Sequence, residues 1–342
     1  MVLLNSTSIA GAIAGIASFG LAFLLVAVVR RLALNAGMID IPGIRSSHVR
    51  PTARGGGAAI ILAVAMVGGV CVASDLVPRL SPPIAVTCVV AIFGVAVVGW
   101  VDDRRGVSVS SRLVVHVAAA GLVAGAVVSG QPFGGAACVI ILAASTLAGV
   151  AAINIINFMD GIDGLVASTV VLYNIYVLMI VGTSHVLGWG ALLVGAASCG
   201  FLLWNWPPAK VFLGDVGSGT LGLIMAFEGA ALVTRFGVSV AAAFLPLVPV
   251  VADAMFTILQ RISIGENLTT PHRKHLYQRL ANGGWGHGRV ATLYACATAA
   301  GVGIGLRWGD SLLTCGAYAA AVLAVGTVLH RSAPAVNGSV CS

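Results

Sequence analysis

"PIAVTCVVAIFGVAVVGWVDDRRG", residues 83–106, joins an apolar run to a pair of acids. The run from 83 to 101 contains no charged side chain and ends directly before Asp102 and Asp103. A helix needs about 20 apolar residues to cross the ~30 Å hydrocarbon core of a bilayer. Backbone polar groups in that core must bond within their own segment. The stretch therefore predicts a membrane-spanning helix that ends in two carboxylates.

Runs of this kind recur along nearly the whole chain. Of its 342 residues 59% are hydrophobic and 8% are charged, and the mean hydropathy is +1.04. A soluble protein, even one with buried helices, needs more polar surface than this chain has. We predict an all-α polytopic integral membrane protein with about eleven transmembrane helices in a single domain, residues 1–342. The expected spans are 9–29, 57–74, 83–101, 112–129, 135–153, 164–182, 187–203, 218–234, 238–258, 289–306 and 311–329.

The charge distribution predicts how these spans are oriented. Of the 18 Lys and Arg residues, 15 fall in alternate connections and the C-terminal tail, which identifies that side as cytoplasmic. The net charge of +7 is thus a membrane signal, and no nucleic-acid partner is expected. Arg30 and Arg31 follow the first span, which predicts an uncleaved anchor with the N-terminus outside. Residues 330–342 are expected to form a disordered cytoplasmic tail. The seven cysteines show no paired spacing and predict no disulfide framework.

Acids and amides gather on the same side of the membrane. "NIINFMDGIDGL", residues 154–165, places Asn154, Asn157, Asp160 and Asp163 at steps of three. Its glycines disfavour a continuous helix, so the two Asn should end one span and the two Asp should lie in a turn. An ordinary Gly-Asp turn is the alternative interpretation. A buried amide without a partner costs about 1–3 kcal/mol, which favours a polar site.

Two further stretches place acids at helix ends. Asp102 and Asp103 at a helix C-terminus oppose the macrodipole, which favours a cationic partner over a merely solvated helix end. "WPPAKVFLGDVGSGTLG", residues 206–222, sets Asp215 between glycines before a span. Such glycines let backbone N–H groups approach a phosphate, and a nearby carboxylate can hold Mg²⁺ bound to that phosphate. A capped helix start is the alternative interpretation.

Basic residues concentrate in two stretches on that side. "PHRKHLYQRL", residues 271–280, and "IPGIRSSHVRPTARGGG", residues 41–57, are both rich in Arg and His. A basic run beside a membrane often only binds anionic lipid. Acids for a divalent cation together with Arg and His for phosphate oxygens instead indicate metal-assisted phosphoryl transfer at a membrane face. The rival class is a transporter for an anionic metabolite. Its ionisable groups should lie at mid-membrane and its halves should repeat, and neither is evident.

Five stretches occur together in one order: "MIDIPGIRSSHVRPTARGGG", "GWVDDRRG", "NIINFMDGIDGL", "WNWPPAKVFLGDVGSG" and "PHRKHLYQRL". In that order they resemble the polyprenyl-phosphate N-acetylhexosamine-1-phosphate transferases of glycosyltransferase family 4. The forms "RSSH…PTARGGG" and "HRKHLYQRL" are most similar to the branch that initiates O-antigen. The transferase that makes peptidoglycan lipid I is a more distant relative and the second candidate. The sequence departs from many relatives at Gly106, where they carry a third acid.

The resemblance implies a transferase in the bacterial cytoplasmic membrane, multi-pass and with its active site facing the cytoplasm. It would move an amino-sugar 1-phosphate, such as N-acetylhexosamine-1-phosphate, from a UDP-sugar to polyprenyl (undecaprenyl) phosphate. The products would be polyprenyl-diphospho-sugar and UMP, in the first membrane step of a cell-surface polysaccharide such as the O-antigen of lipopolysaccharide. Mg²⁺ is the expected cofactor, with Mn²⁺ as a substitute. A homodimer is compatible with the sequence, although no motif requires one.

The resemblance also implies roles for individual residues. The metal ligands would be Asp215 and Asn157. The catalytic residues would be Asp102, Asp103, His272 and His275. The substrate would be bound by Asn154, Asp160, Asp163, Arg45, His48, Arg54, Arg112, Lys210, Arg273 and Arg279. Asp102 or Asp103 would be the general base, but a phosphate monoester is already mostly a dianion at neutral pH, so a base is not required.

Overall fold

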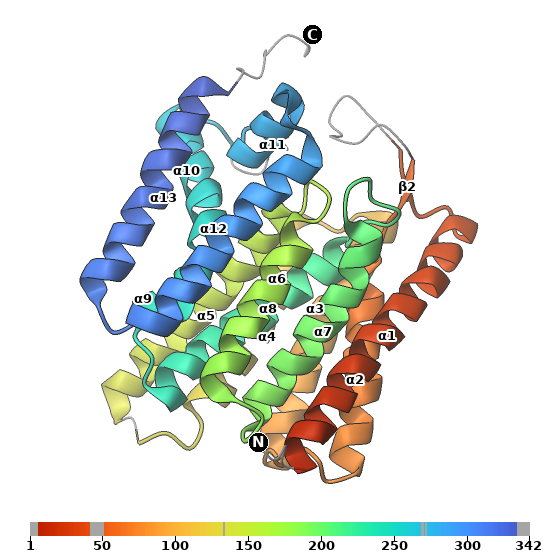
Figure 1. Ribbon diagram of the computed structural model, residues 1–342, viewed down its shortest axis with the longest axis vertical. Helices are drawn as coiled ribbons and strands as arrows, with labels where there is room; N and C mark the ends of the chain where they lie inside the picture. The colour runs from red at the N-terminus through yellow and green to blue at the C-terminus, as the bar shows by residue number, and fades with distance from the viewer. Residues whose placement is uncertain (1–5, 42–50, 133, 268–269, 271, 334–342) are drawn as a thin grey trace, which may run out of the picture.

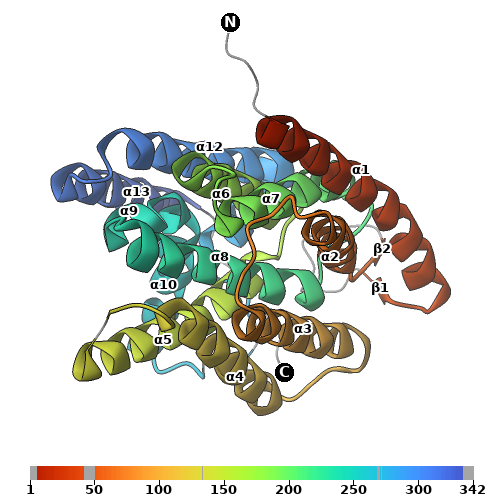
Figure 2. The ribbon, with the colours of Figure 1, turned by 90° about the horizontal axis from the view of Figure 1, so that it is seen from below.

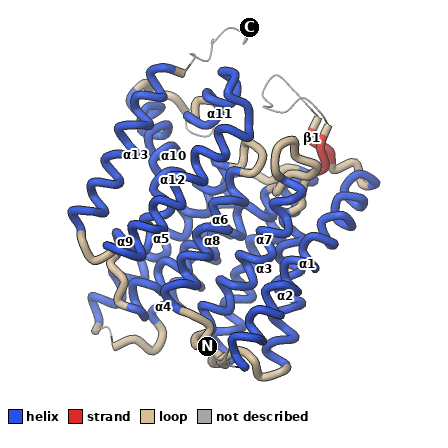
Figure 3. Tube along the Cα trace, viewed as in Figure 1, coloured by secondary structure: helices blue, strands red, loops and turns tan. Residues whose placement is uncertain are grey.

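The chain forms a bundle of roughly aligned helices (Figures 1 and 3). A computed structural model describes residues 6–41, 51–132, 134–267, 270 and 272–333. The elements in chain order are α1 (Ser6–Asn35), β1 (Ile39–Asp40), β2 (Thr52–Ala53), α2 (Gly57–Ala73), α3 (Pro82–Arg105), α4 (Val109–Val128), α5 (Gly135–Met159), α6 (Leu165–Val181), α7 (Val186–Asn205), α8 (Asp215–Phe236), α9 (Val240–Phe244), the 3₁₀ turn η1 (Leu245–Leu247), α10 (Val248–Ser263), α11 (Leu276–Leu280), the π turn η2 (Ala281–Trp285), α12 (Gly286–Trp308) and α13 (Leu312–Ser332).

The predicted all-α membrane architecture is confirmed. Nine helical segments within the described part of the chain are long and apolar enough to cross a membrane. The two remaining expected spans correspond to α2 and α6, which are apolar but have only 17 residues each. Large apolar side chains such as Phe93, Ile140, Leu147 and Leu313 are exposed on α3, α5 and α13. Such faces suit contact with lipid chains.

Three details differ from the sequence-based expectation. The span expected at 238–258 is divided into α9, η1 and α10, because Pro246 and Pro249 lack the N–H that a continuous helix needs. Residues 330–332, expected in a disordered tail, belong to α13, which continues through Ser332, while residues 334–342 lie outside the described part of the chain. The short antiparallel pair β1–β2, with Ile39 opposite Ala53, was not expected in an all-α chain.

Helix α8 lies at the centre of the bundle (Figure 2). Most of its residues are buried, and it packs against α2, α3, α4, α5 and α6. The ends of α3 and α5 and the starts of α4 and α8 reach the same end of the bundle as β2 (Figure 1). The described parts of the five stretches singled out by sequence thus converge on one end of the bundle.

Backbone pairing attaches the segment after β2 to the segment before α8. Phe212 N donates to Ala53 O at 2.8 Å, and Gly56 N donates back to Phe212 O at 2.8 Å. Gly57 N donates to Leu213 O at 2.8 Å. This ladder brings Arg54 beside the start of α8, although the two segments are about 160 residues apart in sequence.

A candidate active site at one end of the bundle

Asp103 caps the start of α8 from the neighbouring helix α3. Its Oδ1 accepts a hydrogen bond from Asp215 N at 3.0 Å, and its Oδ2 accepts one from Val216 N at 3.2 Å. The first N–H groups of a helix have no partner within it, and a carboxylate there also stabilises the dipole. The Asp103 side chain is 0% exposed. In this position it orients Asp215 rather than facing open solvent.

Gly99 lets α3 approach α8 closely enough for this cap. A Cβ at Gly99 would lie 2.5 Å from Asp215 O and 2.6 Å from Val216 N. Backbone atoms at that distance cannot move aside without displacing the helix. Gly99 is thus a packing requirement of the acid cluster.

We expect Gly99→Ala to separate α3 from the start of α8 and to lower activity by about a hundredfold, the cost of misplacing a reacting group by ~1 Å. The matched control is Gly94→Ala on the same helix, where the added Cβ would meet only Val115 Cγ1 at 3.9 Å. Product formation by both variants in the same detergent is the measurement. Equal activities would show that the close approach is unnecessary.

Arg112, at the start of α4, links two acids of the cluster. Its Nη1 donates to Asp102 Oδ2 at 2.6 Å and to Asp215 Oδ2 at 3.2 Å. Asp102 Oδ1 accepts from Val107 N at 2.5 Å, which fixes the turn between α3 and α4. Asp102 and Asp215 therefore share one cation and lie side by side.

Arg54 supplies the second cation. Its Nε lies 3.3 Å from Asp103 Oδ1, and its Nη2 lies 3.9 Å from Asp215 Oδ1. Burial acts to lower the pKa of Arg54, but the carboxylates of Asp103 and Asp215 outweigh it and raise that pKa. Each carboxylate oxygen of Asp215 consequently lies near an arginine. The acids of the cluster therefore attract cations to the start of α8.

The end of α5 and the turn after it bring further polar groups to the start of α8. The helix ends at Met159, and Asp160 lies in the following turn, where it accepts a hydrogen bond from Gly214 N. Burial raises the pKa of Asp160 well above its ordinary value, while Arg54 opposes that shift. Asn157 Nδ2 donates to Ser218 Oγ at 3.0 Å, one turn after Asp215. Ser218 was not assigned from the sequence, although it lies in the motif around Asp215.

A polar cavity of about 470 Å³ adjoins this cluster. Its lining includes Asp40, Arg54, Asp103, Arg104 and Arg105. Arg45 and His48, two predicted phosphate contacts, lie outside the described residues, so their assignments stay predictions.

Asp163 is held in a separate contact near the cluster. Its Oδ1 lies 3.1 Å from His287 Nδ1, and its Oδ2 accepts from Ala209 N at 3.0 Å. These contacts join the turn after α5 to the segment before α8 and to the start of α12. His287 was missed by sequence reasoning, since it lies beyond the basic stretch and belongs to no recognised motif.

Asp253 of α10 holds the basic stretch in place by accepting hydrogen bonds from its backbone. Leu276 N and Tyr277 N donate to Asp253 Oδ1 and Oδ2 at 2.8 and 3.1 Å. Tyr294 OH donates to Oδ2 at 2.6 Å, and His275 Nδ1 lies 3.6 Å from Oδ1. Asp253 was not assigned a role from the sequence, although it lies within a membrane-spanning segment, where an acid usually marks a functional role.

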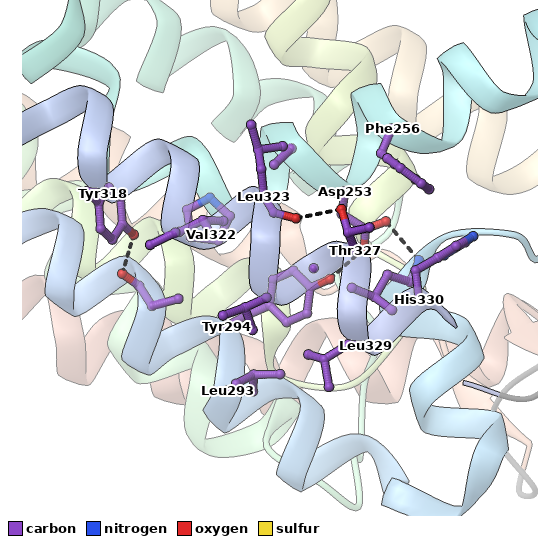
Figure 4. A pocket seen from close by; sticks show the side chains of 17 residues that line it. Asp253, Phe256, Leu293, Tyr294, Tyr318, Val322, Leu323, Thr327, Leu329 and His330 are labelled. Carbon is purple, nitrogen blue, oxygen red and sulfur yellow. Dashed lines mark hydrogen bonds between the residues drawn. The ribbon is translucent and has the colours of Figure 1, made fainter. Parts of the chain in front are cut away.

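This anchor borders an apolar cavity of about 230 Å³ between α10, α12 and α13 (Figure 4). Its lining includes Phe256, Leu293 and Leu329 beside Asp253 and Tyr294. Tyr277 OH donates to Phe158 O at 2.7 Å and contacts Gly161. The Asp253 anchor is therefore in contact with the turn that carries Asp160.

The two histidines of the stretch differ in accessibility. His275 is 3% exposed and packs on Tyr277 with ring centroids 5.7 Å apart. His272 is half-buried, and its ring lies 5.0 Å from that of His275. Burial, with the neighbouring His275 and Arg261, lowers the pKa of His272 to about 4. His272 is consequently a neutral hydrogen-bonding group at pH 7.

Other predicted site residues make contacts away from the acid cluster. Asn154 Nδ2 donates to Val150 O within α5 at 2.7 Å. Lys210 Nζ lies 5.4 Å from the centre of the Trp204 ring. Arg279 Nη2 donates to Ala333 O at 2.7 Å, and its Nη1 contacts His330. Arg273 is half-buried at the start of the basic stretch. Their substrate roles stay predictions.

A metal site is only partly formed by protein side chains. Among the residues that the structure describes, no three His, Cys, Asp or Glu side chains are spaced to share a metal ion. Mg²⁺ is usually held by one or two carboxylates together with substrate phosphates and water. Asp215 and the amide oxygen of Asn157 are ligands of the right kind, because Mg²⁺ prefers oxygen donors. The residues present thus fit Mg²⁺ in the company of a phosphate substrate.

Comparison with known proteins identifies relatives of this chain. Residues 85–251 match the model of "Glycosyl transferase family 4". The chain is 30% identical over 326 residues to the decaprenyl-phosphate N-acetylglucosaminephosphotransferase of Mycobacterium tuberculosis, covering 82% of this chain and 78% of that protein. It is 29% identical over 293 residues to the probable undecaprenyl-phosphate N-acetylglucosaminyl 1-phosphate transferase of Bacillus subtilis, covering 80% and 78%. A phospho-N-acetylmuramoyl-pentapeptide-transferase of Acaryochloris marina is 31% identical over 230 residues, 58% of this chain and 60% of that protein.

Proposed function

The chain belongs to glycosyl transferase family 4 and is a glycosyl-1-phosphate transferase, and we propose that it transfers N-acetylglucosamine-1-phosphate from UDP-N-acetylglucosamine to a polyprenyl phosphate. The proposal takes the sugar from the names of the two relatives that cover about four fifths of the chain. The product would begin a cell-surface polysaccharide, and its assignment to O-antigen stays a prediction.

One observation carries the proposal: Asp102, Asp103 and Asp215 converge with Arg54 and Arg112 at one end of a membrane bundle. Two phosphorylated reactants repel each other, so their transfer requires positive charge at fixed positions. The arginines can turn from the carboxylates to the phosphate oxygens, while Asp103 holds the start of α8 in place.

The proposed reaction balances without a further co-reactant. An oxygen of the acceptor phosphate attacks the β-phosphorus of the UDP-sugar. The bond from that phosphorus to the bridging oxygen breaks, and UMP leaves with the oxygen and its electron pair. The sugar C1–O bond is retained, so the anomeric configuration is kept. The polyprenyl chain of the acceptor stays in the bilayer.

We propose that Asp215 and Asn157 hold Mg²⁺ when the phosphates are bound, with Mn²⁺ as a substitute. The cation would supply positive charge at the transferring phosphate, in addition to that of the arginines. Asn157 Nδ2 donates to Ser218 Oγ, so its Oδ1 would be the oxygen that binds the cation. Asp160 and Asp163 are proposed to bind the nucleotide, and the turn that carries them is fixed by Tyr277 and His287.

A substrate panel tests the transferred sugar. Purified protein should release UMP from UDP-N-acetylglucosamine only when decaprenyl or undecaprenyl phosphate is present. UDP-N-acetylmuramoyl-pentapeptide should react at least about a hundredfold more slowly, because an unsuitable substituent disrupts positioning. This second substrate is included because a relative that acts in lipid I synthesis aligns with 58% of the chain. Preference for the pentapeptide substrate would replace the proposal with that activity.

We also propose that the acid cluster faces the cytoplasm of a bacterial inner membrane, on the charge bias described above. Ser110 lies at the cluster end of α4, and Ser74 lies at the opposite end of α2. In a cysteine-free protein, Ser74→Cys should react with a membrane-impermeant thiol reagent in intact cells. The matched Ser110→Cys should react only after permeabilisation. The reverse pattern would invert the orientation.

A further inference from the structure

Helix α8 carries a second acid, Glu228, far from the acid cluster. It lies thirteen residues after Asp215, which is about 20 Å along a helix. The Glu228 side chain is within the membrane-spanning part of α8, and the residue is 2% exposed. Its Oε2 has no hydrogen-bond partner among the described residues. An acid inside a membrane span is costly and generally marks a functional site.

Glu228 lines a cavity of about 220 Å³ formed by α2, α3, α4, α7 and α8. Ile84, Cys88 and Ile92 form one wall at steps of four along α3, and Val123 of α4 and Leu187 of α7 line other parts. Most of the other lining residues are apolar. The cavity thus combines an aliphatic wall with one buried carboxyl group.

The basic groups at the cavity are already engaged by the backbone. Arg235 Nη2 donates to Ala126 O at 3.1 Å and to Ser129 O at 3.3 Å. His185 Nδ1 accepts from Leu187 N at 3.1 Å. Neither group is hydrogen-bonded to Glu228, which is the only acid among the described residues lining the cavity. The unpartnered Oε2 of Glu228 is therefore available to accept a hydrogen bond from a ligand in the cavity.

We propose that this cavity is a binding site for a small apolar amine, whose ammonium group would donate hydrogen bonds to Glu228. An engineered apolar cavity of about 150 Å³ binds benzene, so this larger cavity has room for a ring and a short amine arm. An ammonium group also compensates the carboxylate charge, and that attraction is strongest where the dielectric constant is low.

Cys88 provides a reporter of occupancy, because its side chain lines the same cavity. Full-length protein that keeps Cys88 as its only cysteine would be treated with methyl methanethiosulfonate, with and without benzylamine. Benzylamine should slow modification of Cys88, whereas toluene at the same concentration should protect it far less. Glu228→Gln should raise the half-protecting concentration of benzylamine by about tenfold or more, as expected for a lost hydrogen bond to a charged group.

Ala231→Phe is the companion variant, since Ala231 lines the cavity one turn from Glu228 and a phenyl ring there would fill it. It should abolish protection while Glu228 remains, and UMP release should persist in both variants because they lie far from the acid cluster. Absence of protection by benzylamine in the native cavity would overturn the proposal. So would equal protection by toluene, or full protection in the Ala231→Phe protein. If Glu228→Gln does not fold, the comparison of benzylamine with toluene and the Ala231→Phe variant still decide.

Discussion

Asp215→Asn is expected to lower UMP release by about a thousandfold, the scale of losing one fixed electrostatic group at a phosphoryl or acyl centre. The substitution keeps the size of the side chain and removes its charge. Arg54 and Arg112 both lie within 4 Å of the Asp215 carboxylate, so the negative charge of Asp215 helps to hold both arginines at the site. A neutral amide would also be a poorer ligand for Mg²⁺. The measurement is kcat together with the Mg²⁺ concentration for half-maximal activity.

The matched control for this substitution is Asp310→Asn. Asp310 is exposed at the opposite end of α12 and contributes nothing to the cluster. Both variants should reach the membrane and show the thermal midpoint of the native protein within the error of measurement. Near-native turnover by Asp215→Asn, with an unchanged Mg²⁺ requirement, would remove Asp215 from the reaction centre.

Hydropathy was enough to predict an all-α bundle of membrane-spanning helices, and the alternation of spans and connections predicted that the acids would share one end of it. The length of an apolar run determines where a span lies. Polar residues such as Asn157, Asp160 and Asp215 are then expected at the ends of spans, where water is accessible. The division between α9 and α10 was missed because an apolar run does not reveal how two prolines break it. The last turn of α13 was missed because its polar residues resemble a solvated tail.

The hydrogen-bond and ion-pair partners of the site residues were less predictable than the places of these residues at helix ends. The sequence places Asp102 and Asp103 together, but only the rotation of α3 decides that Asp103 turns toward α8 and Asp102 toward Arg112. That rotation depends on the close approach at Gly99, a contact between segments more than a hundred residues apart. The pairs of Asp163 with His287 and of Asp253 with Tyr294 are likewise set by tertiary packing. Their residues carry no shared motif.

Neutralising Asp102 and neutralising Asp103, the two acids at the end of α3, should therefore have different effects on activity and stability. Asp102 binds Arg112 through one oxygen and is partly exposed to the site. Asp103 accepts the first two N–H groups of α8 and has no exposed surface. Asn at position 103 can accept only one of those hydrogen bonds, because its amide nitrogen is a donor. Losing a helix cap costs about 0.5–2 kcal/mol of stability.

We expect Asp103→Asn to lower the thermal midpoint in detergent and to lower kcat by about ten- to a hundredfold, since Asp215 would no longer be held in register. Asp102→Asn should leave the midpoint closer to the native value. The deciding measurement is kcat against pH from 5.5 to 9 for the native protein and for Asp103→Asn. A positioning residue lowers the whole profile and leaves its shape unchanged, whereas loss of a general base removes the limb that rises with pH. Disappearance of that limb at an unchanged thermal midpoint would restore Asp103 as the base. A parallel profile with a lowered midpoint would identify it as the residue that holds Asp215.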